Sequence, residues 1–198
     1  WLKGDGDIFL NIQGSTNTPI INGNINISNA EVYFASLEKS LKELEVDMTI
    51  DNHFVKINKT QALLNGSKLD LLGQLDLLGF KPGFLKLQLV SNDFHWEQSN
   101  MNIFSKIRLK ITNTVSEPII GGEVELKGGE YRLLGGSNKS VKTTTEIKSK
   151  KPKVASVDVS FNKLNIEIPQ ETDFWIRSPF FDLRPYGNMK FKKGSIYS

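Results

Sequence analysis

Apolar and polar residues alternate along most of this chain with a period of two. Ile25 and Ile27 alternate with asparagines, and Ile8, Leu10 and Ile12 show the same spacing. The pattern recurs in segment after segment as far as Phe174 and Ile176. Because successive side chains of a strand point to opposite faces, each segment is predicted to be a strand with one apolar and one polar face.

Short turn signals separate these segments. They include Asp51-Asn52, Asn65-Gly66, Lys81-Pro82-Gly83, Gly121-Gly122 and Gly128-Gly129. Strands joined in this way form a long antiparallel meander or a solenoid, with one face exposed to water. Helical spacing occurs only at Leu37, Leu41 and Leu44, where a short helical turn and a loop before the next strand both remain open.

A repeat underlies the alternation. Residues 7–34 align without a gap with residues 106–133, at a constant offset of 99. The identical positions are Ile8, Leu10, Ile12, Pro19, Ile20, Ile21, Gly23 and Glu31, which match Ile107, Leu109, Ile111, Pro118, Ile119, Ile120, Gly122 and Glu130. The prolines are expected at the start of a strand, and the mid-strand glycines at a bulge or a close backbone approach. A tiled strand unit is typical of repeat architectures.

The amino-acid composition excludes several classes of protein. Lysine and arginine number 25 against 22 acidic residues, for a net charge of +3, without the dense basic stripe of a nucleic-acid-binding protein. Cysteine is absent, which excludes zinc-ribbon, iron–sulfur and thiol-nucleophile sites. The two histidines, His53 and His95, are 42 residues apart with no obvious carboxylate partner. We therefore predict no catalytic residue, no metal site and no cofactor.

The repeated phrase, together with the segment 41–77, resembles the C-terminal part of the TamB family, the translocation and assembly module of the AsmA-like group. In that family a strand, a proline, a glycine, a second strand and an acidic residue follow one another. Pro19, Gly23 and Glu31 fit this phrase, and Pro118, Gly122 and Glu130 fit its second copy. The family's following Gly-x-Leu-x-Leu-x-Gly-x-Leu element resembles residues 66–75, with one extra leucine. The likeness covers residues 4–135 best and is looser from Val154 to Ser198.

The resemblance implies a long curled β-sheet with an apolar concave groove. It implies a periplasmic segment of a longer protein that is anchored in the inner membrane by an N-terminal helix. The C-terminal end of such a protein meets an Omp85-type outer-membrane barrel protein. The family is linked to outer-membrane protein assembly and secretion, and to phospholipid movement between the inner and outer membranes.

We therefore expect an all-β chain, a long curled antiparallel sheet, in which residues 1–136 form the groove segment and residues 157–198 continue it. Residues 137–156, which are rich in lysine, are expected to be a mobile loop. The side chains expected to line the groove and contact phospholipid acyl chains are Ile8, Leu10, Ile12, Ile25, Ile27, Val46, Met48, Ile50, Leu69, Leu71, Leu75, Leu87, Leu89, Ile107, Leu109, Ile111, Val124 and Leu126. A closed β-sandwich or solenoid from a surface or adhesion protein is the alternative, because the same residues could form a closed core.

One aromatic cluster departs from simple alternation. It contains Trp175 and Arg177, and the segment Ser178–Gly187 follows it. This cluster is expected either to close one end of the groove or to hold the next segment of the protein.

Overall fold

The computed structural model describes residues 2–15, 18–34, 39–79, 81–133 and 159–196, and these residues form strands and short turns without a helix. Twelve strands make up the sheet: β1 (Leu2–Ser15), β2 (Thr18–Phe34), β3 (Lys39–Asp51), β4 (Phe54–Leu64), β5 (Ser67–Leu78), β6 (Lys81–Gln98), β7 (Met101–Thr114), β8 (Pro118–Arg132), β9 (Val159–Ile168), β10 (Asp173–Arg177), β11 (Asp182–Leu183) and β12 (Gly187–Ile196). The expected lysine-rich loop, residues 137–156, lies outside the described part.

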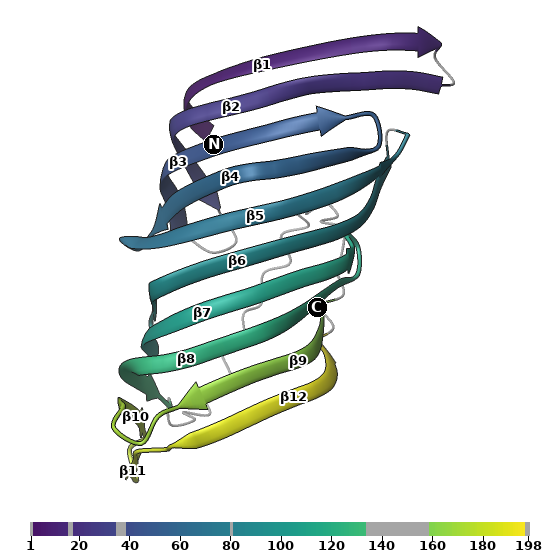
Figure 1. The fold of residues 1–198 in the computed structure, drawn as a ribbon. Coiled ribbons are helices and arrows are strands. Elements are labelled where there is room, and N and C mark those ends of the chain that lie inside the picture. The colour runs from purple at the N-terminus through teal and green to yellow at the C-terminus, as the bar shows by residue number, and fades with distance from the viewer. Residues whose placement is uncertain (1, 16–17, 35–38, 80, 134–158, 197–198) are drawn as a thin grey trace, which may run out of the picture.

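The first eight strands form a simple meander. Each pairs antiparallel with the next one along the chain, so the order in the sheet is the order in the sequence. Figure 1 shows these strands stacked from β1 at one end of the molecule toward the C-terminal strands at the other. This arrangement follows from the short connections, because antiparallel neighbours need only a tight turn between them.

The strand pairing changes from antiparallel to parallel after β8. Both β9 and β10 pair with β8 in parallel, β9 along residues 119–125 and β10 along residues 128–132. Antiparallel pairing then adds β12 to β9 and β11 to β10. The sheet therefore has β1 at one edge and β12 with β11 at the other (Figure 1).

The sheet curls but does not close on itself within the described residues. The long strands curve strongly, and the two edges of the sheet lie at opposite ends of the molecule (Figure 1). The prediction of a long, curled, mostly antiparallel sheet is confirmed. The alternative of a closed sandwich does not describe this arrangement, because one continuous sheet contains all twelve strands.

Extra residues in single strands accompany the curvature. Glu43 has a positive φ of 50°, and the pairing of β3 with β4 shifts between Lys42 and Glu45. As a result Leu41 and Leu44 pair with Val32 and Ala30, which are two residues apart in β2. A bulge thus explains the step of three from Leu41 to Leu44, because one inserted residue interrupts a period of two. Leu37, the other residue of the expected helical spacing, lies outside the described residues.

Three of the expected turns are wrong. Gly121-Gly122 and Gly128-Gly129 lie inside β8, and Lys81-Pro82-Gly83 begins β6, whereas Asp51-Asn52 and Asn65-Gly66 do join strands. Gly122 and Gly129 both have a φ of 120°, which glycine adopts readily and other residues rarely do. A Cβ atom on Gly122 or on Gly129 would lie 2.1 Å or 2.0 Å from a carbonyl oxygen of β7. These two glycines are therefore places of close backbone approach within a strand, as the repeat itself had suggested for Gly122.

The repeat in the sequence is also a repeat in the structure. Ile8 pairs with Ile25 and Ile107 with Val124; Leu10 pairs with Gly23 and Leu109 with Gly122. The same offset of 99 relates the pairs of the two hairpins, β1–β2 and β7–β8, at both ends, except beside the bulge. Each hairpin also carries one extra residue in its second strand, near Ser28 and near Lys127.

The apolar face carries the buried residues of the sheet. Ile25 and Ile27 are half-buried whereas Asn24 and Asn26 are exposed, as expected for the inner and outer sides of a curled sheet. Beside the bulges, small and large side chains pair across strands, as in Ala30 with Leu44, Ala62 with Leu69, and Ser91 with Ile107. All three small residues are buried, which lets the large partners pack on the inner side of the curve.

Candidate functional site: the concave apolar face

Three rows of side chains cross the concave face perpendicular to the strands. Row A is defined by successive register pairs and spans ten strands, in the order Gly6, Ile27, Val46, Thr60, Leu71, Leu89, Leu109, Gly122, Leu164 and Phe191. Row B runs beside it through Ile8, Ile25, Met48, Ile57, Gly73, Leu87, Ile111, Ile120, Phe161 and Gly194. Row C contains Leu10, Gly23, Ile50, Val55, Leu75, Leu85, Asn113 and Pro118.

The structure places all the predicted groove residues on this one face. Thirteen of them belong to the three rows, as the lists above show. Ile12 pairs with Ile21 on the far side of row C. The others lie beyond row A, where Leu69 pairs with Ala62, Ile107 with Val124, and Leu126 with Ser105. Their role in binding lipid is taken up below as a proposal.

Several residues of this face were not among those predicted to line the groove. Val55, Ile57 and Leu85 show the same alternation as their neighbours, and so do Phe161 and Leu164 near the C-terminal end. The alternation of apolar and polar residues therefore includes each of them. What the alternation could not show was which strands of the C-terminal part join the sheet, because β9 reaches β8 through a parallel pairing that no turn signal announces.

The three rows contain no charged side chain. Their polar members are Thr60 and Asn113, and glycines occupy most of the remaining non-apolar positions. Rows A and B each cover nine inter-strand spacings of roughly 4.8 Å, so each is about 43 Å long along the sheet. The concave face is therefore a continuous, uncharged apolar surface that runs across the sheet.

Exposure changes along this surface. Ile8, Leu10 and Ile12 of the edge strand β1 are exposed, whereas Leu85, Ile107 and Leu164 in the interior of the sheet are buried. The difference follows from position, because an edge strand has a neighbour on one side only. The apolar surface is thus most accessible at the β1 end.

The repeated proline, glycine and glutamate positions have distinct structural roles. Pro19 and Pro118 lie within the first two residues of β2 and β8, where a missing amide donor is tolerated. A Cβ atom on Gly23 would lie 2.1 Å from the carbonyl oxygen of Phe9, and one on Gly122 would lie 2.1 Å from that of Arg108. Both glycines are therefore required by close strand contact.

The two repeated glutamates differ. Glu130 forms ion pairs with Arg132 and with Arg177, the latter at 3.1 Å, so it ties β8 to β10. Its equivalent Glu31 pairs with Lys3 in the register of β1 and β2 but makes no ion pair with another described residue. One sequence position thus serves different purposes in the two copies.

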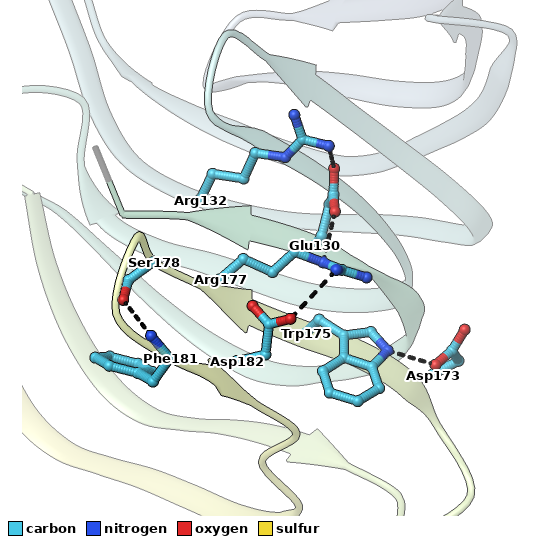
Figure 2. Close-up of polar contacts among 8 residues, drawn as sticks. All are labelled: Glu130, Arg132, Asp173, Trp175, Arg177, Ser178, Phe181 and Asp182. Atoms are coloured by element: carbon cyan, nitrogen blue, oxygen red, sulfur yellow. Dashed lines mark hydrogen bonds and ion pairs between the residues drawn. The ribbon is translucent and has the colours of Figure 1, made fainter. Parts of the chain in front are cut away.

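The aromatic cluster lies on the short hairpin β10–β11 at the C-terminal end of the sheet (Figure 2). Arg177 is its centre: it binds Glu130, pairs with Asp182 at 3.5 Å, and lies 5.4 Å from the ring centre of Trp175. The Ser178 hydroxyl accepts hydrogen bonds from two backbone amides of the turn. These side-chain contacts add to the parallel backbone pairing of β10 with residues 128–132 of β8, away from rows A to C.

The histidines take part in local contacts. His53 is exposed in the turn between β3 and β4. His95 stacks on Phe104 with ring centres 4.4 Å apart, and its Nε2 atom is 2.8 Å from Oδ1 of Asn102. No group of acidic or histidine side chains in the described part of the chain could hold a metal ion. Likewise, no helix in that part is long and apolar enough to cross a membrane.

One carboxyl group on the outer face is perturbed. The Lys127 ammonium group, which hydrogen-bonds the Glu125 carboxylate, holds the pKa of that carboxyl below its ordinary value. The pair lies on β8 beside the bulge at Lys127 and is solvent-accessible. It is a surface contact and plays no part in the concave face.

Comparison with known proteins adds no name to this geometry: no protein-family model, no curated protein and no solved structure matches the chain.

Proposed function

We propose that this chain is a non-enzymatic segment of a cell-envelope bridge, and that its concave face shields phospholipid acyl chains on their way between the inner and outer membranes. The resemblance to the TamB family suggests the setting, a periplasmic segment of an inner-membrane-anchored protein. The observation that carries the proposal is the uncharged apolar surface of rows A to C, about 43 Å long.

The dimensions of this surface suit an extended apolar ligand. The hydrocarbon core of a bilayer is about 30 Å thick, so one leaflet's acyl chains reach about 15 Å. Rows A and B are therefore each nearly three chain lengths long, and their apolar contacts continue from strand to strand. Burial of apolar surface gains roughly 0.8 kcal/mol per CH₂ group and requires no polar partner of fixed position. A chain could thus be held and still slide along the row.

A role in outer-membrane protein assembly and secretion belongs to the same proposal, with an Omp85-type barrel protein as the partner. Among the described residues, β1 and β12 each pair with another strand on one side only, which supports this part, because an exposed sheet edge can accept a strand of another protein. Acyl-chain shielding is the better supported of the two, since it accounts for a face that lacks charge over ten strands.

Photo-crosslinking tests the lipid part of the proposal. A photoreactive residue at Ile25 or at Val124 is expected to form lipid adducts in cells, detected by mass spectrometry of the purified chain. Asn24 is the matched control for Ile25, because it is the preceding residue and points to the outer face. Equal labelling from Ile25 and Asn24, or no lipid at any concave position, would contradict the proposal.

A charge on the concave face gives a second test. Ile27→Asp is expected to stop lipid movement while the chain remains folded, because Ile27 is half-buried in row A. Asn26→Asp adds the same charge to the outer face next to it and is expected to leave lipid movement unchanged. Far-UV circular dichroism of both variants establishes that the fold is retained.

A further inference from the structure

A hollow of about 480 Å³ lies on the outer face of the sheet, across β7, β8 and β9. Gln88, Lys110 and Gly121 line it, and they pair in register with one another between the concave rows A and B. Each of the strands β7, β8 and β9 has a paired neighbour on both sides. The hollow is therefore formed by the interior of the sheet and not by one of its edges.

A glycine leaves the space open. Gly121 is the register partner of Lys110, and it has no side chain to separate this lysine from β9. A Cβ atom on Gly121 would lie 2.4 Å from the carbonyl oxygen of Asn162, which is too close for any other residue without a shift of the backbone. The close approach of β8 and β9 thus requires the glycine that creates the hollow.

A bulge in β9 brings a further lysine to the same place. The register of β8 with β9 shifts opposite Gly121, so that this one residue faces both Asn162 and Lys163. Their neighbours Phe161 and Leu164 both belong to the concave rows, and the two residues between them both line the outer hollow. Lys163 has a φ of 54°, a conformation that lysine rarely adopts. Bulges of this kind redirect side chains, and strained residues often occur at functional sites.

Positive charge dominates the hollow. Its lining among the described residues contains Arg108, Lys110 and Lys163, against the single carboxylate of Glu123. All three cationic side chains are exposed, and none forms an ion pair with another described residue. Their charge is therefore available to an anion from solution.

We propose that this hollow is a binding site for a phosphate group, either of inorganic phosphate or of a phosphate ester. Arg108 offers the planar fork of donors that suits phosphate oxygens, and Lys110 and Lys163 add charged donors from the strands on either side of β8. The hydroxyl of Thr112 and the amide of Asn162 line the same space and can donate further hydrogen bonds.

A second hollow on the outer face has the opposite character. It measures about 440 Å³ and is lined by Asp5, Asp7, Glu45 and Asp47, with Lys59 as its one cation among the described residues. An anion should be repelled there, although the size and the exposure are similar. The two hollows therefore allow specific binding to be distinguished from general attraction to the chain.

Titration of the full chain with inorganic phosphate, against sodium chloride of the same ionic strength, tests the site. Amide chemical shifts of Gly121 and Asn162 are expected to move with phosphate and not with chloride. Lys163→Gln is expected to weaken phosphate binding about threefold to tenfold, because it removes one charge-assisted contact. Lys59→Gln is the matched control: it makes the same charge change in the acidic hollow and should leave the affinity unchanged.

Lys163→Gly separates a binding role from a structural one. Glycine adopts a positive φ without strain, so this variant should unfold at a higher temperature and still bind phosphate as weakly as Lys163→Gln. Unchanged phosphate binding in Lys163→Gly would overturn the proposal. Equal weakening by Lys163→Gln and Lys59→Gln would do the same, since it would show general electrostatic attraction only.

Glycerol 3-phosphate distinguishes the two sources of the phosphate group. Ile119 also lines the hollow and can contact the carbon atoms of an ester. Tighter binding of glycerol 3-phosphate than of inorganic phosphate would support the site with an ester as its ligand, and equal or weaker binding would support it with free phosphate. Absence of shifts at Gly121 and Asn162 with both compounds would refute the site. The hollow lies on the outer face, so none of these results depends on acyl chains in the concave face.

Discussion

The hairpins β1–β2 and β7–β8 share register, bulge and eight identical residues, yet one lies at the edge of the sheet and the other in its interior. Ile8 and Ile107 are the same residue in the same local setting, but only Ile107 is buried. The comparison shows that the local sequence selects the face on which a side chain lies, whereas the neighbouring strand determines how much that side chain contributes to stability. Three pairs of equivalent substitutions and one single substitution test this difference.

Substitution of the equivalent isoleucines by aspartate is expected to give the largest difference. Ile107→Asp would bury a carboxylate without a partner and should lower the free energy of unfolding by more than about 4 kcal/mol. Ile8→Asp, at an exposed edge, should cost less than about 1 kcal/mol. Urea denaturation followed by circular dichroism measures both. Similar losses in the two variants would mean that the edge is covered in solution.

The repeated glycines give the next largest effect. In Gly122→Ala the new Cβ would meet the Arg108 carbonyl, and the residue would keep a φ of 120°, so the expected loss is about 3 kcal/mol. Gly23→Ala meets the Phe9 carbonyl at the same distance but without a positive φ. Because β1 is free to move outward, about 1 kcal/mol is expected there. Thermal unfolding measures the stability loss in both variants. A larger loss in Gly23→Ala than in Gly122→Ala would refute this account.

Substitution of the two repeated glutamates should give a smaller difference in stability. Glu130→Gln removes the ion pairs to Arg132 and Arg177 and is expected to cost about 1 kcal/mol or less, since these are partly exposed pairs. Amides of β10 should exchange faster, because this contact holds β10 to β8. Glu31→Gln is the control and should change neither stability nor exchange. Unchanged exchange in β10 after Glu130→Gln would show that the backbone pairing alone holds the hairpin.

The smallest expected effect is a change in how stability depends on pH. Glu125 is the counterpart of Asn26, and its pKa is lowered in the folded chain by Lys127. A lowered folded-state pKa means that the contribution is present above the ordinary pKa of 4.5 and is lost as the pH falls through the folded value. The group is exposed, so the contribution should stay below about 1 kcal/mol. Denaturation at pH 6 and at pH 3 should show a smaller difference in Glu125→Gln than in the unchanged chain.

Much of the concave face could be predicted because alternation is a local property. Every residue expected to line the groove lies on this face, and the register of the two repeated hairpins follows the offset found in the sequence. Where a bulge inserts one residue, the alternation is interrupted, and the sequence pattern predicts the wrong structure. Leu41 and Leu44 have helical spacing but belong to β3, and the glycine pairs of β8 resemble turns but lie within the strand.

Other features had no local signal. The ion pairs of Arg177 join β8, β10 and β11, which are brought together only when β10 pairs with β8 in parallel. The short hairpin could be recognised as unusual from its aromatic residues, but not as a strand that pairs with β8. Long-range pairing of this kind depends on the whole sheet.

By itself the sequence determined that the chain forms strands, which side of each strand is apolar, and that one hairpin occurs twice. These follow from the period of two and from the positions of proline and glycine, which act within a few residues. Only the tertiary structure decided that the sheet stays open within the described residues, and that the strand pairing changes from antiparallel to parallel after β8. Those properties depend on which strands become neighbours, and burial depends on neighbours that lie far apart in the chain.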